Sequence, residues 1–226
     1  MRDLELRNHS GAVEFRASDK GGTLVGYASV FNKLSQNLGG FVERVDPGAF
    51  NKSLADGVPV FARYNHDDNH LLGTTEAETL RLLVDGTGLR YEVDLPDTSS
   101  GRDVRVLAER GDLRHSSFAF RTLDDDWDFT PEGFPLRTLL AVQLVDVAPV
   151  NNPAYRDTTT GLRSLADHLK LGIEQVKEAA AQGDLRSLFD AGKNSGPTGA
   201  DTDAGGQVEN HPLLSIYRRK LQLHSW

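Results

Sequence analysis

The sequence predicts an α+β protein, built mainly on an antiparallel β-sheet or β-barrel with helices toward its C-terminal end. Short segments in which apolar and polar residues alternate recur between residues 12 and 147, and turn-forming residues separate them. Few helical stretches lie between these segments, so the pattern lacks the strand–helix alternation of parallel α/β folds. After Thr160, apolar residues recur at helical spacing instead.

Period-two alternation defines the predicted strands. Gly26, inside the second of them, indicates a bulge or a close approach of another part of the backbone. In chain order, the predicted strands cover residues 12–16, 23–32, 41–45, 58–64, 79–84, 89–95, 115–123 and 136–147.

Helices and loops are expected at the breaks in this pattern. Asp46 and Pro47 are typical of an N-cap and a first helical position. A second helix is predicted over residues 98–110, with Ser99 or Ser100 as its cap. The acidic residues 124–128 are expected to form a solvated hairpin loop between the last two strands.

Changes in sequence character divide the chain further. Residues 1–160 are expected to form a β-rich body, followed by a helical segment over residues 161–190. That segment is predicted to hold one or two helices, broken near Gly172 and Gly183. Residues 191–226 combine a Gly-rich, flexible linker with a short amphipathic helix that has a basic face.

The composition excludes several classes of protein. The 226 residues include no cysteine, which excludes a disulfide-stapled module, a cysteine-ligated metal site and a cysteine nucleophile. A formal net charge of -8 argues against a nucleic-acid partner, because phosphate binding needs a basic surface. No apolar run reaches the ~18–20 residues that span a bilayer, and the charged N-terminal residues do not resemble a signal peptide. We therefore expect an intracellular protein that is not secreted and has no membrane partner.

Two adjacent serines lie inside a predicted strand, where successive side chains point to opposite faces. Ser116 shares its face with Phe118 and Phe120, which are expected to be buried. Ser117 points to the other face and is the better candidate for a nucleophile. Alternatively, both are ordinary strand hydroxyls.

A histidine and an acid complete a candidate set. His66 follows a predicted strand on a polar turn, where it is either a solvated surface residue or an exposed base. Asp146 lies within an apolar strand, and burying a carboxylate there is costly unless it is paired. It either orients a histidine, forms a salt bridge to Arg63 or Arg137, or is exposed at a sheet edge.

Serine, histidine and an acid are the residue types of nucleophilic acyl transfer. A serine hydroxyl is a weak nucleophile at neutral pH, so a histidine must accept its proton, and a carboxylate stabilises the resulting imidazolium. The sequence therefore suggests Ser117, His66 and Asp146 as a catalytic set that needs no cofactor and no metal. An alternative, a metal hydrolase using His66 and His70, is disfavoured because the turn-forming residues between them do not favour the helical spacing that would align the two histidines.

Several short motifs resemble those of the bacteriophage prohead (head maturation) serine proteases, and they occur in the same order. The motifs are GYASVFN at 26–32, FVE at 41–43, PGAF at 47–50, NHD at 65–67, LGT at 72–74, LRHSSFAF at 113–120, LVDVA at 144–148 and NPA at 152–154. The sequence departs from the family pattern at Ala119, where glycine is common, and at Ala148, where serine is common.

The resemblance implies an assemblin-like serine endopeptidase that acts inside an immature capsid in the host cytoplasm. Its substrates would be the scaffolding portion of the major capsid protein and the protease itself. The implied fold is a mainly antiparallel β-barrel flanked by helices, and the implied assembly is a homodimer or another self-association. By position, His66 would be the base and Ser117 the nucleophile, while Asp146 stands where the family often has glutamate. The alternative is a non-catalytic capsid assembly or scaffolding protein with the same fold.

Overall fold

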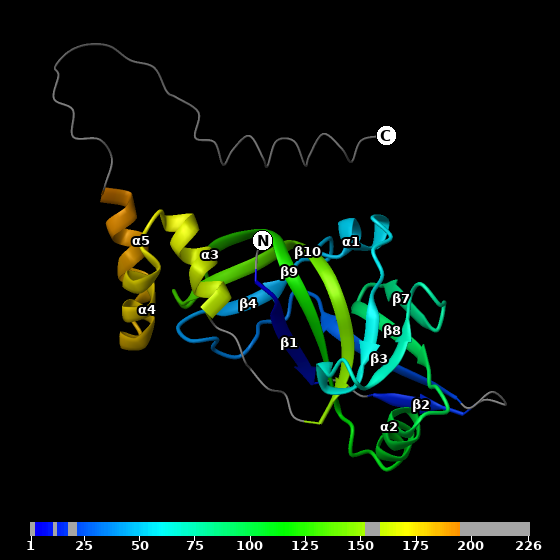
Figure 1. The fold of residues 1–226 in the computed structure, drawn as a ribbon. Coiled ribbons are helices and arrows are strands. Elements are labelled where there is room, and N and C mark those ends of the chain that lie inside the picture. Colours follow the sequence, from blue (N-terminus) through cyan, green and yellow to red (C-terminus); the bar gives the residue numbers. More distant parts are fainter. Residues whose placement is uncertain (1–2, 11–12, 18–21, 152–158, 195–226) are drawn as a thin grey trace, which may run out of the picture. The chain divides into compact units, whose positions relative to one another are not determined.

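The strands form two sheets in the part of the chain that the computed structural model describes, residues 3–10, 13–17, 22–151 and 159–194 (Figure 1). A six-stranded sheet has the order β1-β9-β10-β5-β6, with β4 also paired to β10, and a four-stranded sheet has the order β2-β3-β8-β7. The strands are β1 (Glu5–Ser10), β2 (Glu14–Arg16), β3 (Thr23–Val30), β4 (Val42–Val45), β5 (Phe61–Arg63), β6 (Leu71–Thr74), β7 (Leu80–Val84), β8 (Gly88–Asp94), β9 (His115–Phe129) and β10 (Pro135–Val150).

Helices connect the strands and follow them, which confirms the α+β class. They are α1 (Asn51–Ala55), the 3-10 turn η1 (Tyr64–His66), α2 (Ser99–Glu109), α3 (Thr159–Leu169), α4 (Ile173–Gln182) and α5 (Leu185–Asn194). Pairing is antiparallel except where β4 and β5 run parallel to β10. The two sheets are hydrogen-bonded separately, and their closure into a barrel stays a prediction.

The main core lies between the sheets, where the apolar positions of the alternating pattern meet. Leu24 of β3, Tyr91 of β8, Phe120 of β9 and Leu144 of β10 are all buried in it. The close approach at Gly26 is made by side chains rather than by another part of the backbone: a Cβ there would lie 2.7 Å from the Tyr91 hydroxyl and 2.9 Å from the Ser116 hydroxyl.

The hairpin of β9 and β10 is longer than predicted, and the expected loop at residues 124–128 is wrong. These acidic residues continue β9, with Asp126 opposite Thr138 and Asp128 opposite Leu136. The chain reverses later, where the Thr130 amide donates to the Phe134 carbonyl. Strand pairing and the burial of Trp127 override the turn preference of the aspartates.

Two helix starts also differ from the prediction. The Asp46 carboxylate accepts from the Gly48 amide at 2.8 Å, which holds a turn, and α1 begins only after Phe50. The cap of α2 is Thr98 rather than Ser99 or Ser100, because the Thr98 hydroxyl accepts from the Gly101 amide.

The segment after β10 forms three helices over residues 159–194, not one or two. The breaks at Gly172 and Gly183 confirm the prediction, and Gly183 ends α4 with a φ of 70° that suits glycine. Leu165, Val176 and Phe189 from these helices pack with Phe41 and Trp127 in a second cluster. The helices therefore belong with the strands to one compact unit, Met1–Lys193. The predicted linker and basic helix lie almost entirely outside the described residues.

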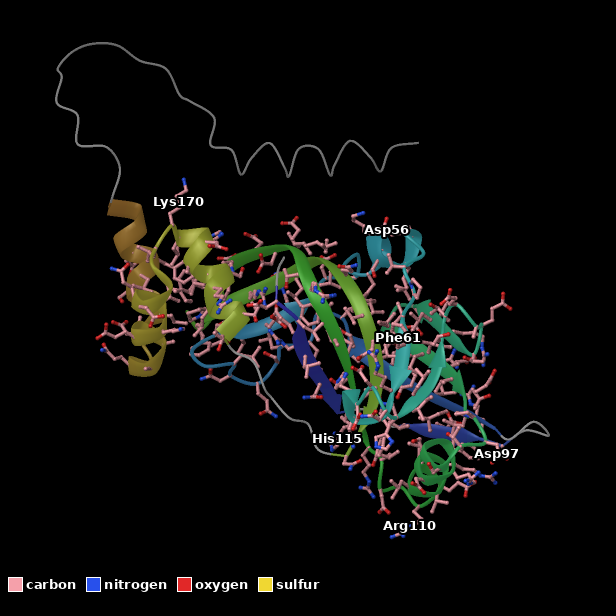
Figure 2. All side chains as sticks on the ribbon, viewed as in Figure 1. Asp56, Phe61, Asp97, Arg110, His115 and Lys170 are labelled. Carbon is pink, nitrogen blue, oxygen red and sulfur yellow. The ribbon has the colours of Figure 1, made fainter. Side chains whose placement is uncertain are left out.

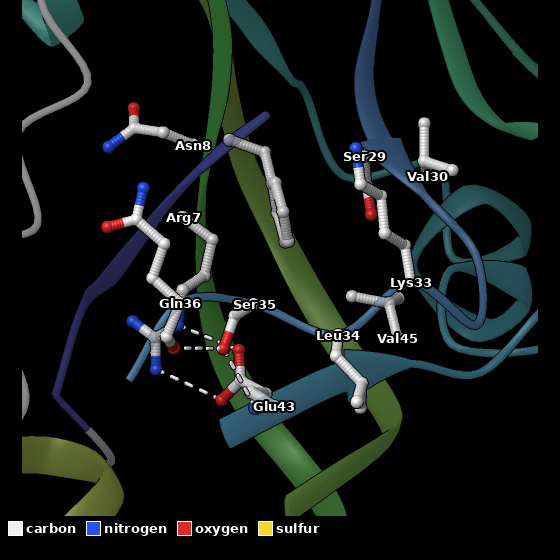
Figure 3. Close-up of a pocket in the computed structure, with 11 residues that line it drawn as sticks. Arg7, Asn8, Ser29, Val30, Lys33, Leu34, Ser35, Gln36, Glu43 and Val45 are labelled. Carbon is white, nitrogen blue, oxygen red and sulfur yellow. Dashed lines mark hydrogen bonds and ion pairs between the residues drawn. The ribbon is translucent and has the colours of Figure 1, made fainter. Parts of the chain in front are cut away.

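β1 and β6 were not predicted, and β1 is fixed by a buried ion-pair network. Arg7 pairs with Glu5 at 2.6 Å. It also pairs with Glu43 at 2.7 Å (Figure 3). Arg137 of β10 pairs with the same two glutamates and with Asp125 at 2.6 Å. The network ties β1, β4, β9 and β10 together.

No helix among the described residues is long and apolar enough to cross a membrane.

Candidate active site

β9 places the two serines on opposite faces, as the alternation predicts. The Ser116 hydroxyl lies 2.9 Å from the Tyr91 hydroxyl in the core between the sheets. Burial raises the pKa of Tyr91, so its phenol stays protonated and hydrogen-bonded there. Ser117 points to the opposite face, between Asn8 of β1 and Ala148 of β10 in the strand register.

His66 stands on a tight turn between β5 and β6. Asn65 and His66 have φ values of 56° and 59°, in the left-handed region that few residues other than glycine adopt. Asn151, after the end of β10, holds the turn: its amide donates to the Asn65 side chain at 3.0 Å, and its side chain accepts from the Tyr64 hydroxyl. The strained turn is therefore anchored to the sheet that carries Ser117.

Asp146 lies on β10 beside a register irregularity between Leu144 and Asp146. It pairs with Ala119 on β9, two residues from the serine, and with Phe61 on β5. The parallel pairing of β5 with β10 brings the β5–η1 connection past Asp146. A strand order that only tertiary structure sets thus puts the acid between the other two candidates.

His66 lies within hydrogen-bond distance of both of the other predicted residues. Nε2 of His66 is 2.6 Å from Oγ of Ser117, and Nδ1 is 2.6 Å from Oδ1 of Asp146. An ionised carboxylate only accepts hydrogen bonds, so Nδ1 carries the imidazole proton and Nε2 is free to accept from the serine hydroxyl. Figure 2 labels His115 and Phe61, which mark the starts of the strands that lead to Ser117 and His66.

The site is covered rather than open. Ser117 is fully buried, with 0% of its surface exposed, and Asp146 is 3% exposed. The Ser117 hydroxyl also lies 3.0 Å from the main-chain carbonyl of Arg7, a second acceptor for its proton. A substrate carbonyl can reach Oγ only after the surroundings of Ser117 move.

The contacts of Asp146 and His70 bear on the alternatives that the sequence leaves open, a salt bridge for Asp146 and a metal site at His66 and His70. Asp146 contacts both His66 and Arg63, whereas Arg137 belongs to the buried network. His70 contacts Ser100, at 2.7 Å, rather than joining His66. No group of three His, Asp or Glu side chains suited to a metal occurs within the described ranges.

A cavity of about 210 Å³ lies on the other face of β9 (Figure 3). Its lining includes Arg7, Ser29 and Phe118. Phe118 points away from the Ser117 face, so this cavity is separate from the candidate site. The Arg63–Asp146 ion pair is one of the alternatives that the sequence predicts for Asp146. The contacts of Asn151 and of the Arg7 carbonyl, by contrast, follow from no pattern in the sequence.

Comparison with known proteins places the chain in a family. The family model of the caudovirus prohead serine protease matches residues 11–171, most of the chain. The chain belongs to that family. The prohead protease of Enterobacteria phage HK97 is 26% identical over 144 residues, which cover 63% of this chain and 62% of the HK97 protein. A solved structure of the bacteriophage T4 capsid assembly protease, gp21, aligns with a TM-score of 0.46 and 11% identity, over 65% of this chain and 96% of that one.

Proposed function

We propose that this chain is a serine endopeptidase that cleaves the scaffolding portion of a major capsid protein, and itself, during prohead maturation. The observation that carries the proposal is the chain of two 2.6 Å contacts from Ser117 through His66 to Asp146. Membership of the prohead serine protease family supports the reaction and the capsid substrate.

In the proposed reaction, Ser117 Oγ attacks the scissile carbonyl carbon while His66 Nε2 takes the hydroxyl proton. Asp146 stabilises the imidazolium through Nδ1–H. His66 then gives the proton to the leaving amine, the C–N bond breaks, and an acyl-serine forms. Water, deprotonated by His66, then attacks the acyl carbon. The ester bond to Oγ breaks, His66 returns the proton to Oγ, and the product leaves with a new carboxyl group.

The finer features of the assembly belong to the same proposal. The sheets approach each other where β1 lies near β3 and β6 lies near β8, which supports closure into a barrel. We further infer a homodimer or another self-association, activity within the procapsid, and a C-terminal tail that follows α5.

One observation favours a second candidate, a non-catalytic capsid assembly protein with the same fold. The complete burial of Ser117 would suit a serine that never meets a substrate. The two functions make opposite predictions for the same experiment, because a non-catalytic protein shortens neither itself nor a capsid subunit.

The test is co-expression of the full chain with the major capsid protein encoded in the same phage genome. We expect mass spectrometry to detect a shortened capsid subunit with the unsubstituted chain and with Ser116→Ala, but not with Ser117→Ala. Ser116→Ala is the matched control, since it removes an adjacent hydroxyl that faces the core. Processing that persists in Ser117→Ala contradicts the assignment of the nucleophile, and an intact subunit in every sample supports the assembly protein.

A further inference from the structure

We propose that Arg63 is a positioning residue of this site, which fixes the Asp146 carboxylate so that one oxygen always faces His66. The inference rests on the proposed function and adds to it a fourth side chain outside the serine–histidine–acid set. The side-chain contacts of Arg63 are with Asp146, Asp68 and Phe61, so its effect on His66 passes through Asp146.

The two oxygens of Asp146 have separate partners. Oδ1 is 2.6 Å from Nδ1 of His66, and Oδ2 accepts from Nη1 of Arg63 at 2.9 Å. The Asp146 side chain is 4% exposed, so water hardly reaches either oxygen. A carboxylate bound at both oxygens cannot rotate without breaking an ionic hydrogen bond. Arg63 also supplies the charge that a buried carboxylate requires while His66 is neutral.

Arg63 is itself held from several sides. Its guanidinium lies over the Phe61 ring, 4.5 Å from the ring centre, and Nη2 is 3.0 Å from Oδ1 of Asp68. Phe61 of β5 is also the register partner of Asp146 on β10. The Arg63 guanidinium, stacked on Phe61, therefore lies on the strand next to the Asp146 carboxylate. The planar guanidinium, with its N–H donors in fixed directions, suits this geometry. A lysine ammonium would keep the charge but not the fixed directions of the donors.

The charge of Arg63 has a second, opposing effect. A guanidinium across the carboxylate disfavours the positive imidazolium that forms when His66 takes the serine proton. On the turn that carries His66, Asp68 pairs with Arg63 at 3.0 Å, and Asp67 accepts from the Asn69 amide and lies 3.8 Å from His70 Nε2. The orientation that Arg63 gives to the Asp146 carboxylate therefore raises the reaction rate, whereas its positive charge lowers the rate. Substitutions that keep the charge or remove it can separate the two effects.

The experiment measures the initial rate of capsid-subunit shortening by the full-length protein as a function of pH. We expect Arg63→Gln to lower the rate about 10- to 100-fold, the cost of misplacing a catalytic group. In Arg63→Gln the acidic limb of the pH–rate profile moves to higher pH, because nothing then opposes the imidazolium. Arg63→Lys also lowers the rate but leaves that limb in place. In an Asp146→Asn background, Arg63→Gln has no further effect.

The matched control is Arg81→Gln, which breaks an ion pair with Asp94 in the other sheet and should leave the rate unchanged. An unchanged rate and an unchanged pH–rate profile in Arg63→Gln would overturn the positioning role. So would a double variant, Arg63→Gln with Asp146→Asn, whose rate is lowered by the product of the two single losses. If Arg63→Gln fails to fold, Arg63→Lys carries the test through its rate. If the unsubstituted chain shortens nothing, the proposed function fails first, so the two failures are distinguishable.

Discussion

At the scale of the residue, the candidate base sits in a conformation that costs energy. Left-handed φ values at Asn65 and His66 cost of order 1–3 kcal/mol each, and such strain persists where the surroundings enforce it. Here Asn151 and Tyr64 hold the turn. The strain directs the imidazole back over the sheet, so that it reaches both Ser117 and Asp146.

Asp146→Asn tests the tautomer of His66. An asparagine amide can donate to Nδ1 and favour the wrong imidazole tautomer, so we expect the processing rate to fall about 10³-fold or more, as in the general serine protease template. The measurement is the initial rate of capsid-subunit shortening. Asp94→Asn, which also removes a charge paired with an arginine, is the control. A rate within tenfold of the unsubstituted protein would show that Asp146 does not orient the base.

At the scale of the element, the position of Ser117 depends on how closely β3, β8 and β9 pack. Gly26 of β3 touches the side chains of Tyr91 and Ser116, and Ser116 is the immediate neighbour of the proposed nucleophile. The absence of a side chain at Gly26 allows the strands this close. The β9–β10 hairpin then carries the serine and the acid on one rigid unit.

Gly26→Ala should therefore strain β9. The added methyl would meet the Tyr91 hydroxyl at 2.7 Å, and Tyr91 is fully buried. We expect the free energy of unfolding to fall by about 1–3 kcal/mol, measured by urea denaturation. Gly86→Ala is the matched control, since a Cβ there has no atom within 4 Å. Equal stability of the two variants would contradict the close packing.

At the scale of the whole molecule, the network of Glu5, Arg7, Glu43, Asp125 and Arg137 joins strands that are distant in the sequence. It holds β1 beside β9, where the Arg7 carbonyl contacts the Ser117 hydroxyl. A buried ion network adds little net stability compared with apolar packing, but losing one member leaves uncompensated charge. Its removal should therefore affect both the fold and the surroundings of Ser117.

Arg137→Met measures this coupling. Arg137 is fully buried and pairs with Glu5, Glu43 and Asp125, so its loss leaves Glu5 and Glu43 with Arg7 as their remaining arginine and removes the arginine paired with Asp125. We expect a loss of about 3–5 kcal/mol in the free energy of unfolding, measured by urea denaturation. The exposed pair broken by Arg81→Gln should cost about 1 kcal/mol or less. Similar losses in both variants would argue against a tight buried network.

Acid should weaken the same network. Burial by itself raises the pKa of Glu5, but the attraction of Arg137 and Arg7, with hydrogen bonds from Arg137 and Thr122, lowers it below its ordinary value of 4.5. A carboxylate with a lowered pKa contributes stability that is complete above pH 4.5 and is lost as pH falls through the folded-state pKa.

We therefore expect thermal unfolding of Glu5→Gln to depend less on pH below 4.5 than that of the unsubstituted protein. Glu132→Gln, which changes an exposed acid, should leave this dependence unchanged. Parallel pH dependences for Glu5→Gln and the unsubstituted protein would contradict the contribution of Glu5.

The sequence by itself determined most of the strands, the opposite faces of Ser116 and Ser117, the three candidate residues and the family, because alternation and short motifs are local. Tertiary structure decided what no local pattern contains. The burial of Trp127 and the pairing with β10 turned acidic residues into strand, and the parallel register of β5 brought His66 to Asp146. β1 and Arg63 acquired their roles only through partners on distant strands, since strand pairing and charge burial depend on residues far away in the chain.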